Sequence, residues 1–428
     1  PRMRLQAHAL LFAAALLSPA LHAQDAGARP GPASAVADPQ AASTQVPLDE
    51  IRRFVSVFNA VRQAYVEPVS DEELMQAAIK GLLLDLDPHS IYFDKDDADA
   101  FREETSGAYG GIGVEVQPQP DGSIMVVAPI DGTPAERAGL ESGDLIIAVD
   151  GRQLQPGEDG RDPLRGEPGS KVVVTIAREG RAEPFDVAIT RETIRIASVR
   201  GEMLEPGYGY IRIAAFQPDT AADFESELAV LQQQSGGLDG LVLDLRSNPG
   251  GLLVSAVQIA DDLLDKGVIV STRGRIALSE TNFGATPGDR LRGAPLVVLV
   301  DAGSASAAEV LAGALRDNDR ARIVGSRTFG KGSVQTLLPL DNGDSVKLTT
   351  ARYYTPDGTS IQAVGIVPDV VLQPGSSDEG EARPRVTEAA LPGHLRGNAE
   401  DGGPGGEVLD GPAPIRAALR ILKSQPAR

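Results

Sequence analysis

The 428-residue sequence contains no cysteine and no tryptophan, and it has only four histidines. The absence of cysteine excludes disulfides, thiol catalysis and cysteine-based metal sites. Lysine and arginine total 40 against 60 aspartates and glutamates, which gives a formal net charge of -20. Phosphate contacts need clustered basic residues, so this balance argues against a non-specific nucleic-acid binder. An acidic excess of this size more often keeps a protein soluble than it identifies a partner.

The N-terminal segment has the pattern of a secretory signal. Arg2 and Arg4 precede the short apolar run ALLFAAALL, and the small residues of SPALHAQ follow it. The run is too short for an ordinary membrane-spanning helix. Residues 1–23 are therefore expected to form a signal peptide, cut after Ala20 or Ala23, or an uncleaved anchor in the inner membrane. Residues 24–47 contain too few large apolar side chains to fold and are expected to be a disordered linker, so the mature protein is expected in a periplasm or outside the cell.

The rest of the chain changes its pattern three times and predicts an α/β multidomain protein. Residues 48–105 carry apolar side chains at three-to-four spacing, which predicts a helical region. Residues 106–192 read as short strands and turns, with hairpins about Asp121-Gly122 and Glu179-Gly180. Strands alternate with helices over residues 193–372, which is typical of crossover units on a mixed sheet. Residues 373–428 are rich in Gly, Pro and Glu and are expected to be mostly linker, with one late helix near 414–423.

Two serines, Ser304 and Ser306, stand at a helix start in DAGSASAAEVLAGAL. The preceding run LVVLVD predicts a buried strand, so both serines are expected at the edge where open α/β sheets place their sites. A helix N-terminus also supplies N–H groups that can stabilise a developing oxyanion. The alternative is a structural cap, because Ser306 and Glu309 fit the pattern S-x-x-E. Taken alone, the pattern favours capping over catalysis.

A nucleophilic serine needs a base, and the histidines of this chain offer almost no candidate. Three lie in the predicted signal segment or in the tail: His8, His22 and His394. His89 follows an Asp-Pro pair and is expected in a turn. Lys331 remains, because a deprotonated lysine can accept a proton, and the glycines on both sides of it allow close approach of another backbone. A surface lysine is the ordinary alternative, whereas a phosphate loop is disfavoured because Gly332 stands where a hydroxyl residue is required.

Six motifs together resemble those of the C-terminal processing peptidases, also called tail-specific proteases. They are DPHSIYF, YGGIGVEV, GTPAERAGLESGDLIIAVDG, DLRSNPGG, GSASAAE and RTFGKGSVQ, and the resemblance runs from about Asp49 to Asp369. These enzymes are Ser–Lys proteases with an inserted PDZ domain. The resemblance implies a PDZ domain over residues 106–192, an α/β serine protease core over 193–372, and no metal or cofactor. The substrates it implies are proteins or peptides with free apolar C-termini, while an adaptor protein and a homodimer stay open.

The resemblance also assigns catalytic roles. The nucleophile falls on Ser306, the general base on Lys331, and the residue that orients the lysine on Gln335; positions four apart on a strand face the same side. The oxyanion hole is expected to use the N–H of Ala307 together with a second donor from the NPGG turn, for which Gly250 and Gly251 both remain open. Three polar residues are expected to hold that turn in shape: Asp244, Arg246 and Asn248.

YGGIGVEV resembles a carboxylate-binding loop followed by an edge strand, on which a peptide could pair. The peptide-binding residues this implies are Gly110, Gly111, Ile112, Gly113 and Val114. Arg165 in PLRGEPGS matches an arginine that senses bound peptide in the family, and its ordinary alternative is a solvated turn residue. The rival to a protease is a PDZ scaffold with an inactive protease fold. The complete set of serine, lysine and glutamine argues against that rival.

Overall fold

The structure is a computed structural model that describes residues 46–155, 162–276, 279–372, 386–397 and 404–425. The predicted signal segment and all but the end of the predicted linker lie outside this part of the chain. Two compact units are found, residues 1–71 and 72–428. In the first, α1 (Leu48–Ala64) buries none of its side chains. Among the described residues, no helix combines the length and the apolar character needed to cross a bilayer.

The second unit begins with the remaining helices of the predicted helical region, α2 (Asp71–Leu84) and α3 (Lys95–Ser106). Between them lies a strand that the sequence did not predict, β1 (Ile91–Phe93), which pairs antiparallel with β18 (Ser345–Tyr354). Tyr92 stands opposite Val346 in this pairing. A three-residue strand is too short to show alternation, and its partner is remote in sequence. The pairing brings the DPHSIYF motif beside the strands that carry the site.

The next segment forms the β-rich domain that was predicted. Its main sheet has the order β3-β4-β5-β7-β8, all antiparallel, while β6 pairs with β5 and β2 pairs with β9. Inward-facing Val126, Ile146 and Val174 are fully buried in its own core. The elements are β2 (Ala108–Gly111), β3 (Val114–Pro118), β4 (Ile124–Pro129), α4 (Pro134–Arg137), β5 (Leu145–Val149), β6 (Arg152–Gln153), η1 (Asp162–Leu164), β7 (Lys171–Ala177), β8 (Phe185–Thr190) and β9 (Glu192–Arg195).

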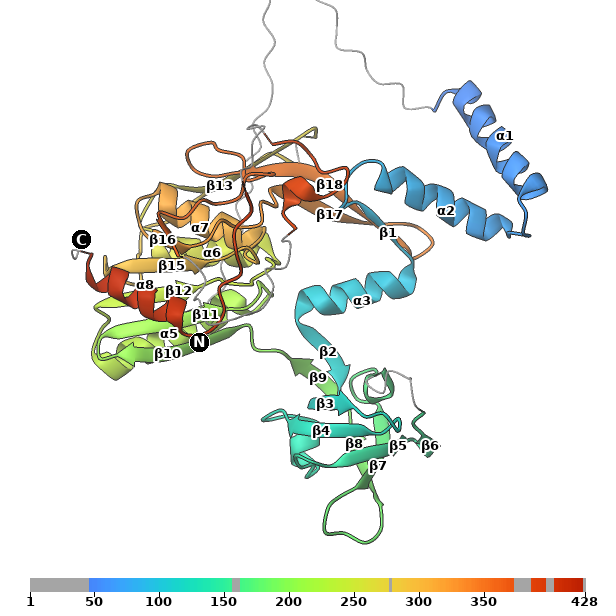
Figure 1. The fold of residues 1–428 in the computed structure, drawn as a ribbon, viewed down its shortest axis with the longest axis horizontal. Helices are drawn as coiled ribbons and strands as arrows, with labels where there is room; N and C mark the ends of the chain where they lie inside the picture. Colours follow the sequence, from blue (N-terminus) through green and yellow to red (C-terminus); the bar gives the residue numbers. More distant parts are fainter. Residues whose placement is uncertain (1–45, 156–161, 277–278, 373–385, 398–403, 426–428) are drawn as a thin grey trace, which may run out of the picture. The chain divides into compact units, whose positions relative to one another are not determined.

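A six-stranded mixed sheet, in the order β10-β11-β12-β15-β16-β19, forms the centre of the following segment (Figure 1). Only β10 and β11 are antiparallel, and the other neighbours run parallel. The predicted alternation of strands and helices is therefore confirmed. The elements are β10 (Val199–Glu205), β11 (Tyr208–Ile213), α5 (Thr220–Ser235), β12 (Gly240–Asp244), α6 (Leu253–Leu263), β15 (Leu296–Val300), α7 (Ala307–Asp317), β16 (Arg322–Gly325) and β19 (Val370–Val371).

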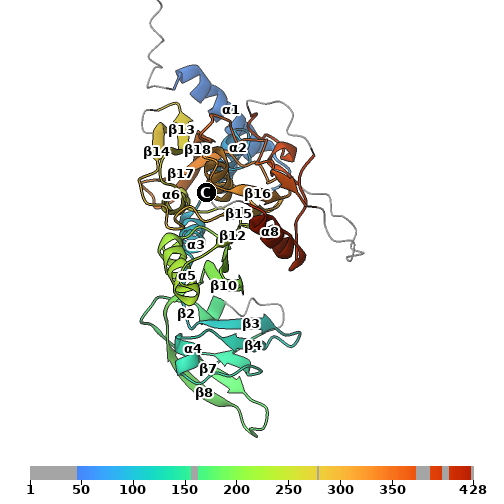
Figure 2. The ribbon, with the colours of Figure 1, turned by 90° about the vertical axis from the view of Figure 1, so that its left-hand side faces the viewer.

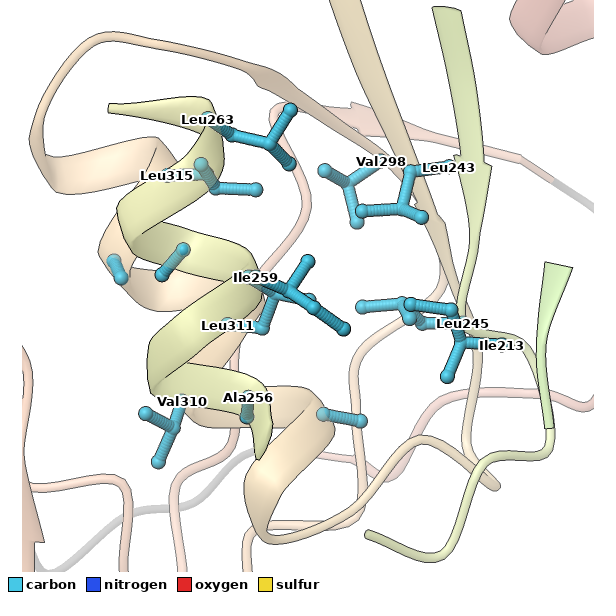
Figure 3. Packing of buried hydrophobic residues seen from close by; sticks show 14 of the residues in the cluster. Ile213, Leu243, Leu245, Ala256, Ile259, Leu263, Val298, Val310, Leu311 and Leu315 are labelled. Atoms are coloured by element: carbon cyan, nitrogen blue, oxygen red, sulfur yellow. The ribbon is translucent and has the colours of Figure 1, made fainter. Parts of the chain in front are cut away.

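Helices α5, α6 and α7 cover one face of this sheet. Figure 3 shows Ile259 of α6 and Leu311 of α7 directed toward Leu245 and Ile213 at the ends of the strands. These side chains are fully buried, and replacing one such leucine by alanine typically costs about 2–5 kcal/mol. The packing fixes where α7 begins, and with it the position of the serines at its start.

A second sheet combines strands from before and after α7. Its path is β1-β18-β13-β14, and β17 pairs with β18. The remaining elements are β13 (Val268–Gly274), β14 (Thr281–Gly284) and β17 (Ser333–Pro339). A register shift between Val334 and Gln335 interrupts the pairing of β17 with β18. Such a bulge turns the side chains that follow it and re-aims them.

The late helix predicted near residues 414–423 is present, but described residues before it are folded as well, so the prediction of a linker was wrong there. Helix α8 (Ala413–Lys423) covers the opposite face of the central sheet from α5 (Figure 2). Ala418 and Leu422 are buried against Val242 and Val297. Composition suggested a linker because glycine and proline dominate the surrounding residues, but the second face of a parallel sheet also has to be covered. The short 3-10 turn η3 (Glu388–Ala390) also lies in the tail.

Candidate active site

A tight turn, residues 301–306 and called here the nucleophile turn, joins β15 to α7. Ser304 is fully buried; its hydroxyl donates to the carbonyl of Leu245 at 2.7 Å and accepts from the N–H of Asp301 at 2.9 Å. The carboxylate of Asp301 accepts from the N–H of Ser247 at 2.7 Å and from that of Gly303 at 2.9 Å. Ser304 is therefore a structural residue of the turn.

Ser306 immediately precedes α7 and has φ 54° and ψ -115°. A residue with a Cβ rarely adopts this conformation, which costs about 1–3 kcal/mol and persists only where the surroundings enforce it. The N–H of Ser306 donates to Oε2 of Glu309 at 2.8 Å. The S-x-x-E pattern therefore does form a capping box, in which the glutamate side chain accepts the hydrogen bond from the N–H of Ser306. The Ser306 side chain lines a cavity.

That cavity has a volume of about 710 Å³ and receives all three residues predicted for catalysis. Ser306, Lys331 and Gln335 come from the start of α7, the loop before β17 and β17 itself. Gly250 and Gly251 line the same cavity. Several apolar side chains complete a surface that suits an extended peptide: Phe101, Phe216, Leu252, Leu337 and Tyr353.

Lys331 lies in residues 327–332, called here the base loop. The flanking glycines are needed for close approach, because a Cβ at Gly332 would lie 2.2 Å from the nitrogen of Gln362. Gly330 has φ 97°, and a Cβ there would lie 3.1 Å from the nitrogen of Gly365. Burial lowers the pKa of Lys331, and the positive charge of Lys347 lowers it further. A lysine in this setting is more readily deprotonated at neutral pH, which is what a general base requires.

Gln335 and Lys331 line the same cavity, but not for the reason expected. Lys331 precedes β17, and the bulge at Gln335 breaks the strand period, so the argument from residues four apart was wrong. The amide nitrogen of Gln335 donates to Ser333 Oγ at 3.0 Å and to Thr349 Oγ1 at 3.3 Å. These bonds leave the amide oxygen as an acceptor that can face an ammonium or amine.

Gly250 and Gly251 differ in the state of their N–H groups. The N–H of Gly250 donates to Asn248 Oδ1 at 2.8 Å, whereas within the described ranges the N–H groups of Gly251 and Ala307 have no acceptor. Gly250 lies against Ser306, because a Cβ at Gly250 would meet the Cβ of Ser306 at 2.8 Å. Asn248 holds the NPGG turn as expected, also donating to Ile213 O at 2.9 Å.

Among the described residues, the side chains of Asp244 and Arg246 form no hydrogen bond with the NPGG turn, which corrects the role expected for them. The guanidinium of Arg246 binds the Asp244 carboxylate at 2.6 Å and donates to the carbonyls of Leu409 at 2.5 Å and Gly411 at 3.1 Å. The pair therefore anchors the segment before α8. Sequence reasoning assigned these residues to the turn because they precede it directly in the chain.

A second cavity, of about 430 Å³, lies in the β-rich domain along β3. Ile112, Gly113, Val114 and Arg165 line it, whereas Gly110 and Gly111 belong to β2 and pair with β9 instead. Of the predicted peptide-binding residues, these two glycines are therefore not part of the groove. Within the described part of the chain β3 pairs with β4 alone, so it is an edge strand with a free side for a further chain.

Arg165 is half-exposed at this groove and makes two contacts. Its guanidinium lies 5.0 Å from the ring centre of Tyr109 and 3.7 Å from Oε2 of Glu103 in α3. Other residues of α3, among them Phe101 and Arg102, line the 710 Å³ cavity. One helix therefore contacts Arg165 and borders the cavity that holds Ser306.

The DPHSIYF motif contributes residues that sequence reasoning did not assign to the site. Asp87 Oδ1 accepts from Thr349 Oγ1 at 3.0 Å, and Thr349 in turn accepts from Gln335. His89 Nε2 lies 2.8 Å from Glu388 Oε2 and does not line the cavity. The one available signal was the position of the motif within the resemblance, which gives no role. Among described residues, no group of three or more His, Asp or Glu side chains is placed to hold a metal ion.

Comparisons with known proteins agree with this architecture. Residues 207–372 match the model of peptidase family S41, residues 125–178 match a PDZ domain, and residues 21–97 match the activating protease CtpB N-terminal domain. A carboxy-terminal-processing protease of Bartonella bacilliformis is 42% identical over 356 residues, covering 82% of each chain. The carboxy-terminal processing protease CtpA of Bacillus subtilis is 37% identical over 318 residues, covering 73% of this chain and 67% of its own.

Among solved structures, the photosystem II D1 C-terminal processing protease is 33% identical, with a TM-score of 0.45 over 82% of this chain and all of its own. The identities of the two bacterial relatives, over most of both chains, carry the assignment. The β-rich domain is a PDZ domain, and the α/β core is a family S41 peptidase core. The chain belongs to the carboxy-terminal-processing proteases of peptidase family S41.

Proposed function

We propose that this protease is a serine endopeptidase that uses Ser306 as nucleophile and Lys331 as general base. The observation that carries the proposal is the single cavity lined by Ser306, Lys331 and Gln335. The lowered pKa of Lys331 supports its role, because only the neutral amine can accept a proton. The acceptor oxygen of Gln335 is suited to orient that amine.

In the proposed reaction, Ser306 Oγ attacks the scissile carbonyl carbon while its proton passes to Lys331 Nζ. The carbonyl oxygen becomes an oxyanion, for which the N–H groups of Ala307 and Gly251 are the proposed donors. Gly251 is preferred to Gly250 because the N–H of Gly250 is already bound to Asn248. The Lys331 ammonium then protonates the departing amine, which leaves an acyl-enzyme on Ser306. Water, deprotonated by the same lysine, then attacks the acyl carbon; the bond to Ser306 Oγ breaks, the lysine returns the proton to Oγ, and the acid product is released.

We further propose that the PDZ groove selects substrates through a free apolar C-terminus. Within the described residues, the N–H groups of Ile112 and Gly113 have no acceptor, and both residues line the groove. They are the proposed donors to a terminal carboxylate, with the peptide pairing along β3. Arg165 is proposed to report occupancy of the groove through Glu103 and α3.

The test is cleavage of an unfolded protein substrate with an apolar C-terminal tail. Ser306→Ala is expected to abolish cleavage and to keep the fold, whereas Ser304→Ala is expected to retain cleavage when activity is normalised to folded protein. Active-site serine chemistry is rejected if Ser306→Ala turns over at the wild-type rate.

Location and assembly are also proposals. The N-terminal pattern supports export to a periplasm or secretion, with an uncleaved segment as a membrane anchor, and cell fractionation tests it.

Ile51, Phe54 and Val55 of α1 are each nearly half exposed, which supports a homodimer formed through this region. The match to the CtpB N-terminal domain supports a role for an adaptor protein. Sedimentation of Phe54→Asp beside wild type tests the dimer.

A further inference from the structure

Glu309 is a fully buried carboxylate that contacts the backbone on both sides of the proposed catalytic pair. Its Oε2 accepts from the N–H of Ser306 at 2.8 Å and from the N–H of Lys331 at 2.9 Å. One oxygen atom therefore joins the residue proposed as nucleophile to the residue proposed as base. A helix cap needs only the first of these contacts, so capping does not account for the second.

The other oxygen of Glu309 binds the base loop further. Oε1 accepts from Thr328 Oγ1 at 2.5 Å and from the N–H of Gly330 at 2.7 Å. Thr328 Oγ1 also accepts from the N–H of Ile366 at 2.6 Å, so its own proton points to Glu309. The N–H of Phe329 donates to Ser304 O at 3.1 Å, which adds a direct backbone link between the base loop and the nucleophile turn.

All four partners of Glu309 are donors, which decides its charge state. An ionised carboxylate accepts hydrogen bonds at both oxygens, whereas a protonated carboxyl carries a proton that needs an acceptor. No acceptor faces Glu309 among these contacts. The geometry therefore fits the ionised form, and protonation would turn one donor away.

We propose that Glu309, in its ionised form, is a positioning residue that holds the nucleophile turn and the base loop in the arrangement required for proton transfer. The inference rests on the proposed Ser306–Lys331 chemistry. Glu309 does not line the cavity and acts only through the backbone of its partners. It also holds the N–H of Ser306, whose strained backbone needs such restraint.

The buried environment of Glu309 makes its positioning role sensitive to pH. Burial raises the pKa of Glu309 to about 7, against the hydrogen bonds that favour ionisation. The charged and titratable groups on the neighbouring segments are Lys331 and Arg327 of the base loop, Glu388 with its partner His89, and Asp87 and Lys347 beyond Lys331. The active form needs Glu309 to be ionised and Lys331 to be neutral. Lowering the pH protonates both groups, so log kcat is expected to fall with a slope of two on the acid side of the pH–rate profile.

Glu309→Gln tests the proposal, because it keeps the shape but places an amide NH₂ against two of the donors. We expect kcat per folded molecule to fall about a hundredfold, the size of loss that small misplacements of reacting groups cause. KM and peptide binding to the PDZ groove should change less than threefold. The slope of log kcat against pH on the acid side should drop from two to one.

Two further variants make the outcome decisive. Asp144→Asn is the matched control: it removes another buried carboxylate, bound by Arg178 at 2.6 Å in the PDZ domain, outside the groove lining. It should lower stability and leave kcat on a short peptide unchanged. Should Glu309→Gln not fold, Thr328→Val removes one donor to the carboxylate, which raises the Glu309 pKa and moves the acid limb to higher pH.

The results separate this inference from the proposed function. The positioning role would be overturned if folded Glu309→Gln kept the wild-type kcat and the wild-type slope of log kcat against pH on the acid side. It would also be overturned if Thr328→Val left the acid limb of the pH–rate profile where it is in the wild type. In both cases an inactive Ser306→Ala would still uphold the serine chemistry. An equal loss of kcat in Asp144→Asn would also overturn it, since any buried carboxylate would then serve. Cleavage by Ser306→Ala would instead remove the chemistry on which the inference rests.

Discussion

Gly250→Ala tests how closely the NPGG turn must approach the nucleophile. Gly250 has φ 102°, and a Cβ there would lie 2.8 Å from Ser306 Cβ, 2.9 Å from Ala305 O and 3.1 Å from Ala307 N. Carbon atoms normally stand about 3.5–4.0 Å apart. The methyl group must therefore push the two segments apart by roughly 1 Å. The unfavourable backbone conformation adds about 1–3 kcal/mol of destabilisation.

The displacement reaches the nucleophile and a proposed oxyanion donor together. A shift of about 1 Å at reacting groups can cost about a hundredfold in rate, so kcat of Gly250→Ala is expected to fall by about that factor. Gly358→Ala is the matched control, since Gly358 has φ 83° and nothing lies within 4 Å of its would-be Cβ. Both variants should unfold at a lower temperature, but only Gly250→Ala should lose kcat.

The assay is steady-state cleavage of a short fluorogenic peptide beside thermal unfolding of the same preparations. A short peptide keeps substrate recruitment by the PDZ groove out of the measurement. If Gly250→Ala retains kcat within a few-fold of Gly358→Ala, the tight contact at Ser306 has no catalytic meaning. Equal losses in both variants would point to backbone strain instead.

Three further outcomes are expected. Lys331→Arg should be inactive although it keeps the charge, because a guanidinium is not deprotonated near neutrality; turnover by this variant would place the base elsewhere. Lys347→Gln should raise the pKa of Lys331 by removing a like charge, so the rising limb of the pH–rate profile should move to higher pH; an unmoved limb contradicts this. Amidating a substrate C-terminus should weaken binding to the PDZ groove about tenfold to a hundredfold, since charge-assisted hydrogen bonds contribute about 1.5–3 kcal/mol; equal binding of acid and amide peptides would reject carboxylate recognition.

Local pattern predicted the elements that have a clear period. The amphipathic spacing of α2, the alternation in β7 and the apolar run of β15 all lie where expected. The burial of the serine turn at the edge of the central sheet follows from that strand and helix order. Where the period was short or the composition misleading, prediction failed, as for β1 and for the packed residues before α8, whereas α8 itself lies where a late helix was predicted.

At the site, too, residues within a motif could be predicted, whereas contacts between remote segments could not. Ser306, Lys331 and Gln335 were assigned by motif, and the cavity does bring them together. Glu309 was interpreted as a cap because its contact with Ser306 is local, while its contacts with Thr328, Gly330 and Lys331 depend on a loop that returns from another strand. The periodicity of a sequence does not indicate which remote loop packs against a residue. The four hydrogen bonds to the Glu309 carboxylate could therefore not be predicted from the sequence.

The segment that Arg246 anchors, together with α8, sets an order of assembly for the enzyme. Asp301 of the nucleophile turn accepts from Leu409 N at 3.1 Å, and Ser326 exchanges hydrogen bonds with the backbone of Glu407. These partners are synthesised well after Ser306 and Lys331, and the buried groups that await them are costly to leave unpaired. The emerging chain therefore carries its complete set of catalytic residues before the turn that presents them is fully supported.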